Sequence, residues 1–128
     1  MELLGLHHVA VICSNYSQSK HFYTKILKLP IIAEHYRAAR QSYKLDLALP
    51  NGSQIELFSF PEPPKRPTQP EACGLRHLAL AVNDIVAAVT YLNSYQVETE
   101  AIRVDEFTHK RFTFFRDPDG LPIELYEQ

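Results

Sequence analysis

Two short motifs that each occur twice constrain the fold of this chain more than any other feature of its sequence. Residues 5–15 read GLHHVAVICSN and residues 74–84 read GLRHLALAVND. Residues 50–58 read PNGSQIELF and residues 118–126 read PDGLPIELY. The first motif recurs at an offset of 69 residues and the second at 68. Two matches in the same order and at nearly the same offset indicate that one structural module is present twice.

Each half has the pattern of a strand, a helix and three further strands. Residues 6–12 alternate as a strand does, and Asn15 or Ser17 is expected to cap the helix that follows. Pro30 is expected to end this helix, and Asp84 to cap the helix of the second half. The remaining strands are expected at residues 31–37, 42–49 and 53–60, and at 75–82, 97–104, 110–117 and 121–127.

The repeat predicts an α+β fold built from two βαβββ modules. Each half alone is too small for a stable core. Eight strands in two curved sheets, forming a mixed-sheet cup with the helices outside, would bury enough apolar surface. Residues 61–73, PEPPKRPTQPEAC, contain five prolines and are expected to form a semi-rigid connector. We therefore expect one domain over residues 1–128, with module one at 1–60 and module two at 74–128.

Composition excludes several classes of partner. The formal net charge of −2 and the pI near 6.3 favour neither nucleic acid nor an anionic membrane surface. No apolar run approaches the roughly 20 residues of a spanning helix, and the first residues, MELLGLHHVAVIC, lack the pattern of a signal peptide. Cys13 and Cys73 lack metal-type spacing and are expected to be reduced thiols. Together these observations predict a cytoplasmic protein.

Strand alternation places one histidine and one glutamate of each half on the same face. In the first strand of each half, the bulky apolar residues alternate with His8 or with His77, so the histidines are expected to face the concavity. The same parity on the last strands directs Glu56 and Glu124 into that concavity. Two imidazoles and two carboxylates suit a divalent zinc, nickel, manganese, cobalt or iron ion. The alternative is a structural cluster of polar side chains.

The same parity gives candidate substrate contacts. Lys44 and Asp46 are expected on the concave face, either touching a polar substrate or forming a cross-strand ion pair. Phe112 and Phe114 are expected to line the pocket, with ordinary core packing as the alternative. Arg111, in a charged segment at 103–112, is a candidate clamp for an anion, although such a segment is also typical of a solvated turn.

Five segments carry a resemblance to the vicinal oxygen chelate superfamily, which includes glyoxalase I, bleomycin-resistance proteins and extradiol dioxygenases. They are HHVAV at 7–11, FYTKIL at 22–27, GSQIEL at 52–57, RHLALAV at 76–82 and FFRDPDGLPIEL at 114–125. The resemblance implies paired βαβββ modules around a metal ion that is chelated by adjacent oxygens of the substrate. Glyoxalase I carries a His and a Glu in each module, which match His8, Glu56, His77 and Glu124. One departure is Lys28, where the family often has glycine.

The function that this resemblance implies is that of a glyoxalase-I-like lyase or isomerase. In that chemistry a metal ion stabilises an enediolate while a carboxylate moves a proton between neighbouring carbons. The resemblance assigns the base to Glu124 and implies an adduct of a small 2-oxoaldehyde with a thiol as substrate. It also implies alternatives: an epimerase, a ring-cleaving dioxygenase or a protein that binds a small drug-like molecule.

Two further expectations concern the first histidines and the assembly. His8 is predicted to be the first-module ligand rather than His7, because His8 aligns with His77 whereas His7 aligns with Arg76. A homodimer is expected, since modules of this kind leave unpaired strand edges that natural proteins cover.

Overall fold

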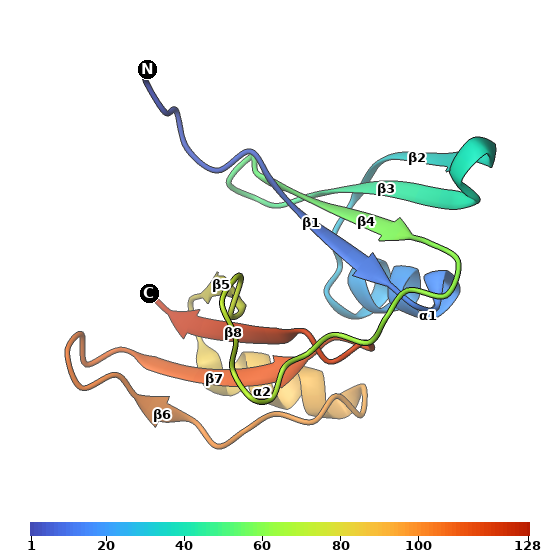
Figure 1. The fold of residues 1–128 in the computed structure, drawn as a ribbon. Coiled ribbons are helices and arrows are strands. Elements are labelled where there is room, and N and C mark those ends of the chain that lie inside the picture. The colour runs from blue at the N-terminus through green and yellow to red at the C-terminus, as the bar shows by residue number, and fades with distance from the viewer. The chain divides into compact units, whose positions relative to one another are not determined.

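The computed structural model describes residues 1–128, which form two units, Met1–Pro64 and Lys65–Gln128 (Figure 1). Each unit contains one four-stranded mixed sheet and the helical segment that follows its first strand. The βαβββ order that the repeat predicts is therefore present in both units, and the α+β class is confirmed.

In the first unit the strand order is β1-β4-β3-β2. The strands are β1 (His8–Cys13), β2 (Ile31–Arg37), β3 (Ser42–Ala48) and β4 (Gln54–Ser59). A single turn of 3₁₀ helix, η2 (Ala38–Arg40), joins β2 to β3. β1 and β4 pair in parallel, and the other neighbours are antiparallel. The outer position of β1 beside β4 places the first and last strands of the module next to each other.

The helical segment of the first unit covers one face of this sheet (Figure 1). α1 (Tyr16–His21) begins after Asn15, whose side chain accepts a hydrogen bond from the Gln18 N–H at 3.0 Å. This N-cap is one of the two that the sequence offered. A π-helical segment, η1 (Phe22–Ile26), continues the helix and ends before Pro30.

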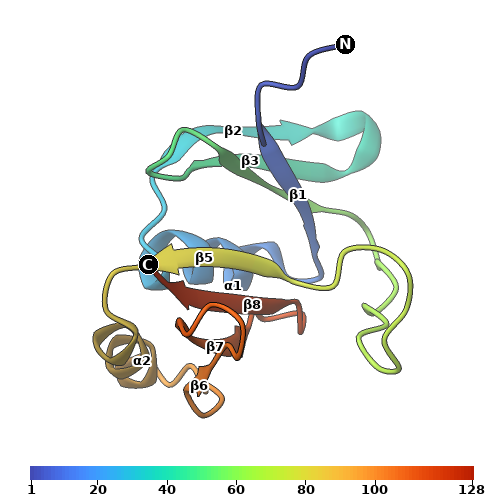
Figure 2. The ribbon, with the colours of Figure 1, turned by 90° about the vertical axis from the view of Figure 1, so that its left-hand side faces the viewer.

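In the second unit the strand order is β5-β8-β7-β6, which repeats the order of the first. The strands are β5 (Leu78–Val82), β6 (Arg103–Val104), β7 (Arg111–Arg116) and β8 (Pro122–Glu127). α2 (Ile85–Ser94) is capped by Asp84, as expected, and contacts β7 and β8 (Figure 2). No helix of the structure is long and apolar enough to cross a membrane.

Alternation along the strands separates a buried face from a more open one in each unit. On the face toward the helix, the first unit buries Val11, Cys13, Leu45, Leu47, Ile55 and Leu57, and the second buries Leu78, Thr113, Phe115, Ile123 and Leu125. The opposite face carries His8, Glu56 and Glu124, which are more exposed. In each unit these side chains thus lie on the face opposite the helix.

Two strands are shorter than their sequence patterns predict. The strand expected at 97–104 is reduced to β6, with one isolated bridge between Thr99 and Phe115. Between these points the Thr113 hydroxyl donates to the Glu100 carbonyl at 2.8 Å. A side chain thus satisfies a carbonyl that would otherwise accept a hydrogen bond from the neighbouring strand.

The strand expected at 75–82 begins only at Leu78. In the first unit the Gln54 N–H donates to the His7 carbonyl at 3.0 Å, which starts the parallel pairing of β1 and β4. The repeat places Pro122 at the position of Gln54. Because proline has no N–H, the equivalent bond to Arg76 is missing and β5 begins later.

Candidate functional site

The first candidate pair is formed by His8 and Glu56 on the neighbouring parallel strands β1 and β4. The His8 Nε2 atom lies 3.5 Å from Glu56 Oε2. The His8 side chain is 41% exposed and that of Glu56 is 15% exposed. The pair is thus accessible from the open face of the sheet, and its carboxylate is partly sheltered from water.

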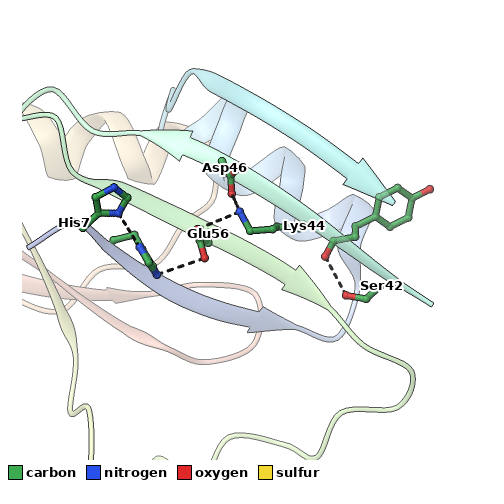
Figure 3. A network of polar contacts seen from close by, with 7 residues as sticks. His7, Ser42, Lys44, Asp46 and Glu56 are labelled. Atoms are coloured by element: carbon green, nitrogen blue, oxygen red, sulfur yellow. Dashed lines mark hydrogen bonds and ion pairs between the residues drawn. The ribbon is translucent and has the colours of Figure 1, made fainter. Parts of the chain in front are cut away.

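Lys44 and Asp46 of β3 extend this pair into a charged network (Figure 3). The Lys44 ammonium lies 2.5 Å from Asp46 Oδ1 and 3.1 Å from Glu56 Oε1. The hydrogen bond to Asp46 raises the pKa of Lys44, and that to Glu56 acts in the same direction against the effect of burial. Lys44 therefore stays protonated and balances part of the charge of two carboxylates that face each other across β3 and β4.

His7 lies beside His8 and not on the opposite side of the strand. The two Nδ1 atoms are 2.9 Å apart, and the rings meet edge to face with centroids 5.2 Å apart. His7 precedes β1, so strand alternation does not fix its side chain. The His8 ring contacts Glu56, and the His7 ring contacts the His8 ring on its other nitrogen.

The second candidate pair repeats this arrangement in the second unit. The His77 Nε2 atom lies 3.1 Å from Glu124 Oε2, and the two side chains are 25% and 14% exposed. The His77 ring meets Phe114 edge to face with centroids 5.1 Å apart. The other ring nitrogen, Nδ1, is buried and has no hydrogen-bond partner.

The surroundings of the two pairs differ although their backbones repeat. Phe112 and Phe114 of β7 occupy the repeat positions of Lys44 and Asp46, and Phe114 lies opposite Glu124 in the β7–β8 register. The Arg103 guanidinium lies over these rings, 4.9 Å from the centroid of Phe112 and 5.7 Å from that of Phe114. One pair therefore stands in a charged environment and the other in an aromatic one.

Arg111 lies apart from these residues. Its position in β7 has the parity of Thr113 and Phe115, which face the helix. Its guanidinium donates two hydrogen bonds of 2.7 Å to Glu127, which also accepts from the backbone N–H of Ile85 at the start of α2. The contact raises the pKa of Arg111 and lowers that of Glu127. The structure thus joins Arg111 to α2 and not to the His77–Glu124 pair.

Arg37 is a contact of the open face that the sequence did not reveal. Its guanidinium lies 5.0 Å from the centroid of Phe58 and 5.8 Å from that of Phe60. No motif or repeat marks this arginine, and the contact joins the end of β2 to Phe58 of β4, a strand that is not its neighbour in the sheet.

The donor atoms present fit a divalent first-row metal ion. Each pair combines one imidazole nitrogen with one carboxylate, a ligand set that zinc, nickel, manganese, cobalt and iron accept. In the second pair, the Nδ1 atom of His77 has no hydrogen-bond partner. In the first pair, Glu56 is held by the Lys44 ammonium, which a metal ion could replace as the neighbouring cation. Neither unit by itself gathers three or more histidine, cysteine, aspartate or glutamate side chains in a metal-binding group.

Several known proteins of similar length are closely similar to this chain. The uncharacterized protein YaeR of Escherichia coli K12 is 60% identical, with 98% of this chain and 100% of that protein covered. The uncharacterized protein YwkD of Bacillus subtilis 168 is 57% identical, with both chains fully covered. The crystal structure of a glyoxalase family protein from Enterococcus faecalis superposes with a TM-score of 0.92 at 46% identity, covering 99% of this chain and 100% of that one.

More distant structures share the fold alone. A lactoylglutathione lyase from Agrobacterium tumefaciens (TM-score 0.73, 15% identity, 99% and 95% covered) has this fold. So does a mutant of the fosfomycin resistance protein FosX from Listeria monocytogenes, complexed with Mn(II) (TM-score 0.75, 17% identity, 99% and 94% covered). The model of the Glyoxalase/Bleomycin resistance protein/Dioxygenase superfamily matches residues 5–125, nearly the whole chain. This chain therefore belongs to the Glyoxalase/Bleomycin resistance protein/Dioxygenase superfamily.

Proposed function

We propose that this protein is a metal-dependent lyase or isomerase of the glyoxalase I type, which moves a proton between neighbouring carbons of a small 2-oxoaldehyde–thiol adduct or a related substrate. One observation carries the proposal. Each module places a histidine nitrogen against a glutamate oxygen, at 3.5 Å in one and 3.1 Å in the other. One such contact could be a structural ion pair. The same contact at equivalent positions of both modules favours a common role, which is the binding of a metal ion.

The proposed ligands of one divalent ion are His8 and Glu56 from one module with His77 and Glu124 from the other. Two carboxylates balance the charge of the ion, and neutral imidazoles complete the set. When bound, such an ion supplies Lewis-acid polarisation of a substrate oxygen. Lys44 would leave Glu56 for the neighbouring Asp46, which it already contacts at the shorter distance.

Glu124 is the proposed general base. Its side chain is only 14% exposed, so water competes little for the proton that the carboxylate takes from the substrate carbon. Returning this proton to the adjacent carbon completes the isomerisation and regenerates the carboxylate. Phe112 and Phe114 form an apolar wall beside Glu124, whereas Lys44 and Asp46 offer polar contacts in the other module.

Similar proteins support this proposal. The distant lactoylglutathione lyase has the proposed activity in its name, and FosX was crystallised with a divalent metal ion. Members of this superfamily bind small molecules and typically a divalent ion.

The experiment is a turnover assay in deuterated water with hemithioacetals of 2-oxoaldehydes and several thiols, and with acyl-CoA esters. We expect activity without oxygen, deuterium at the carbon that receives the proton, and a large loss of kcat in Glu124→Gln with metal retained. Glu106→Gln, an exposed glutamate between β6 and β7, is the matched control and should keep full activity.

Other outcomes of the same assay contradict the proposal. Consumption of dioxygen with a catechol would assign the protein to the ring-cleaving dioxygenases. Tight binding of a small molecule without metal and without turnover would assign it to the binding proteins of the superfamily.

A further inference from the structure

The second unit contains a pocket of about 280 Å³ that the proposed chemistry does not account for. Its walls are residues 66–77, which include the end of the connector and the residues before β5, and parts of β6, β7 and β8. The charged and aromatic residues that line it include Arg66, Arg76, His77, Arg103, Phe114 and Arg116. Because His77 and Phe114 belong to this wall, the pocket adjoins the His77–Glu124 pair.

The pocket carries more positive than negative charge. Four arginines line it, against two glutamates. Arg76 pairs with Glu71 at 2.5 Å, and Arg103 pairs with Glu100 at 2.9 Å. Arg66 and Arg116 have no carboxylate partner in the structure. Two guanidinium charges of the pocket are thus left without an anion.

The chain holds Arg66 in place through backbone carbonyls. Its guanidinium donates to the Leu75 carbonyl at 2.7 Å and to the Arg76 carbonyl at 3.4 Å. The Arg76 carbonyl is available because Pro122 has no N–H to pair with it. These contacts orient the guanidinium without neutralising it, and the Arg66 Nε atom is buried without a hydrogen-bond partner.

Arg116 is the second unbalanced cation. Its guanidinium donates a hydrogen bond of 3.4 Å to the Gly120 carbonyl in the β7–β8 turn. A guanidinium that is held only by a carbonyl keeps donors for a bidentate contact with an oxyanion. The buried donor without a partner is the Nε atom of Arg66, whose burial costs free energy that a bound oxyanion would recover.

We propose that this pocket binds an oxyanionic group, a carboxylate or a phosphate-type group, on the small molecule that the protein acts on. Arg66 and Arg116 hold the group, and the reacting carbons extend toward His77. The assignment of the anion to a substrate rests on the proposed function, whereas binding of an anion by the two arginines does not. A neutral molecule of the same shape is expected to bind poorly.

The test measures binding by calorimetry with the full chain, without added metal and without turnover. The probes are malonate, methylphosphonate and inorganic phosphate, with malonamide as the neutral counterpart of malonate. We expect saturable binding of the organic anions, no binding of malonamide, and affinity reduced on the order of tenfold in Arg66→Gln and in Arg116→Gln, as the loss of a charge-assisted hydrogen bond predicts. Arg40→Gln, in the other unit and outside the pocket, is the matched control and should leave affinity unchanged.

Three results overturn the proposal. They are absence of anion binding by the wild-type chain, an equal loss in Arg40→Gln, and unchanged affinity in both pocket variants. Binding of inorganic phosphate alone would also overturn the assignment to a substrate group.

The outcome is separable from that of the proposed function. Arginine-dependent anion binding by a chain that shows no lyase or isomerase turnover keeps the pocket and rejects the reaction. Turnover whose KM for an anionic substrate is unaffected by Arg66→Gln keeps the reaction and rejects the pocket.

Discussion

The two neighbouring histidines His7 and His8 differ in their counterparts in the second repeat. His8 has a counterpart in His77, and both contact a glutamate through Nε2. His7 has Arg76 as its counterpart, and its side chain contacts the His8 ring. We therefore predict that His8→Ala loses bound metal, whereas His7→Ala retains it with affinity lowered at most on the order of tenfold, the effect of losing a partner that orients a ligand.

Metal content after dialysis, together with a calorimetric titration, measures this difference. His35→Ala, an exposed histidine of β2, serves as the control for loss of an imidazole. Metal loss in His7→Ala with retention in His8→Ala would show that the first strand presents the opposite face.

The side chains of the open face were predictable from parity, and those held by tertiary contacts were not. Lys44 and Asp46 lie beside Glu56, and Phe114 lies beside Glu124, because each alternates with buried leucine or phenylalanine on a regular strand. Arg111 follows the same alternation: it lies between positions of the open face and is therefore directed to the helix side, where it contacts Glu127. Arg66 was not predictable, since a proline-rich connector has no periodicity from which to place a side chain.

At the scale of elements, the backbone is strained at Lys28, just after the first helix, where the sequence departs from the family pattern. Lys28 takes the position at which the family often has glycine, and its φ of 57° is in the left-handed region. A Cβ atom makes this conformation costly, whereas glycine adopts it readily. We predict that Lys28→Gly raises the free energy of unfolding by about 0.5 kcal/mol, after the greater entropy of glycine in the unfolded chain is counted.

Lys25→Gly is the matched variant, three residues earlier inside η1. There the same change is expected to lower the free energy of unfolding by about 1 kcal/mol, because glycine is unfavourable inside a helix. Urea denaturation of both variants gives the comparison. Destabilisation of similar size at both positions would contradict the strain at Lys28.

Glu34 of β2 forms hydrogen bonds with two residues of α1, and these contacts depend on pH. Its carboxylate accepts hydrogen bonds from the Lys20 ammonium at 2.6 Å and from the Tyr16 hydroxyl. The hydrogen bond from Lys20, followed by that from Tyr16, lowers the pKa of Glu34 below its ordinary value of 4.5. The contact therefore stabilises the fold above that ordinary value, and the stabilisation is lost as the pH falls through the lowered pKa.

We predict that Glu34→Gln lowers the free energy of unfolding at pH 7 by less than about 1 kcal/mol, since the pair is about one third exposed. The difference from wild type should vanish in acid, in denaturant titrations at matched ionic strength. The control Glu98→Gln should show no difference at either pH. If the difference in the free energy of unfolding persisted in acid, the glutamine would perturb packing. The charge of Glu34 would then not be the source of the stabilisation.

Element boundaries show where sequence patterns stop being informative. The repeat predicts the order of strands and helices in both units, because hydrophobic periodicity and turn residues determine the secondary structure of each segment from its own sequence. It does not predict that β5 starts at Leu78, since this depends on Pro122, a residue about 40 positions away that cannot pair. The short β6 has a similar cause, because the Thr113 side chain replaces a backbone donor at Glu100.

At the scale of the whole molecule, exposed apolar side chains favour self-association. Leu3, Leu4 and Leu6 are 82%, 93% and 65% exposed, in the segment that leads into β1, an outer strand of its sheet. Burying such side chains and covering a sheet edge both stabilise an assembly. We predict a homodimer in sedimentation experiments at micromolar concentration, with the dimer weakened on the order of tenfold or more by changing Leu3 and Leu4 to serine.

Phe107→Ser is the control for this prediction, since Phe107 is 84% exposed in the turn between β6 and β7. It should leave the dimer intact. A monomer at all concentrations, or equal weakening by the control, would contradict the predicted role of the leucines.

In the proposed function, two modules with one His–Glu pair each provide one metal centre. The most direct test is the metal content of the purified chain, by elemental analysis, in wild type, in Glu56→Ala and in His77→Ala. We expect one divalent ion per chain in wild type and its loss when either module is changed, with circular dichroism showing that the fold is retained. Unchanged metal content in both variants would contradict it.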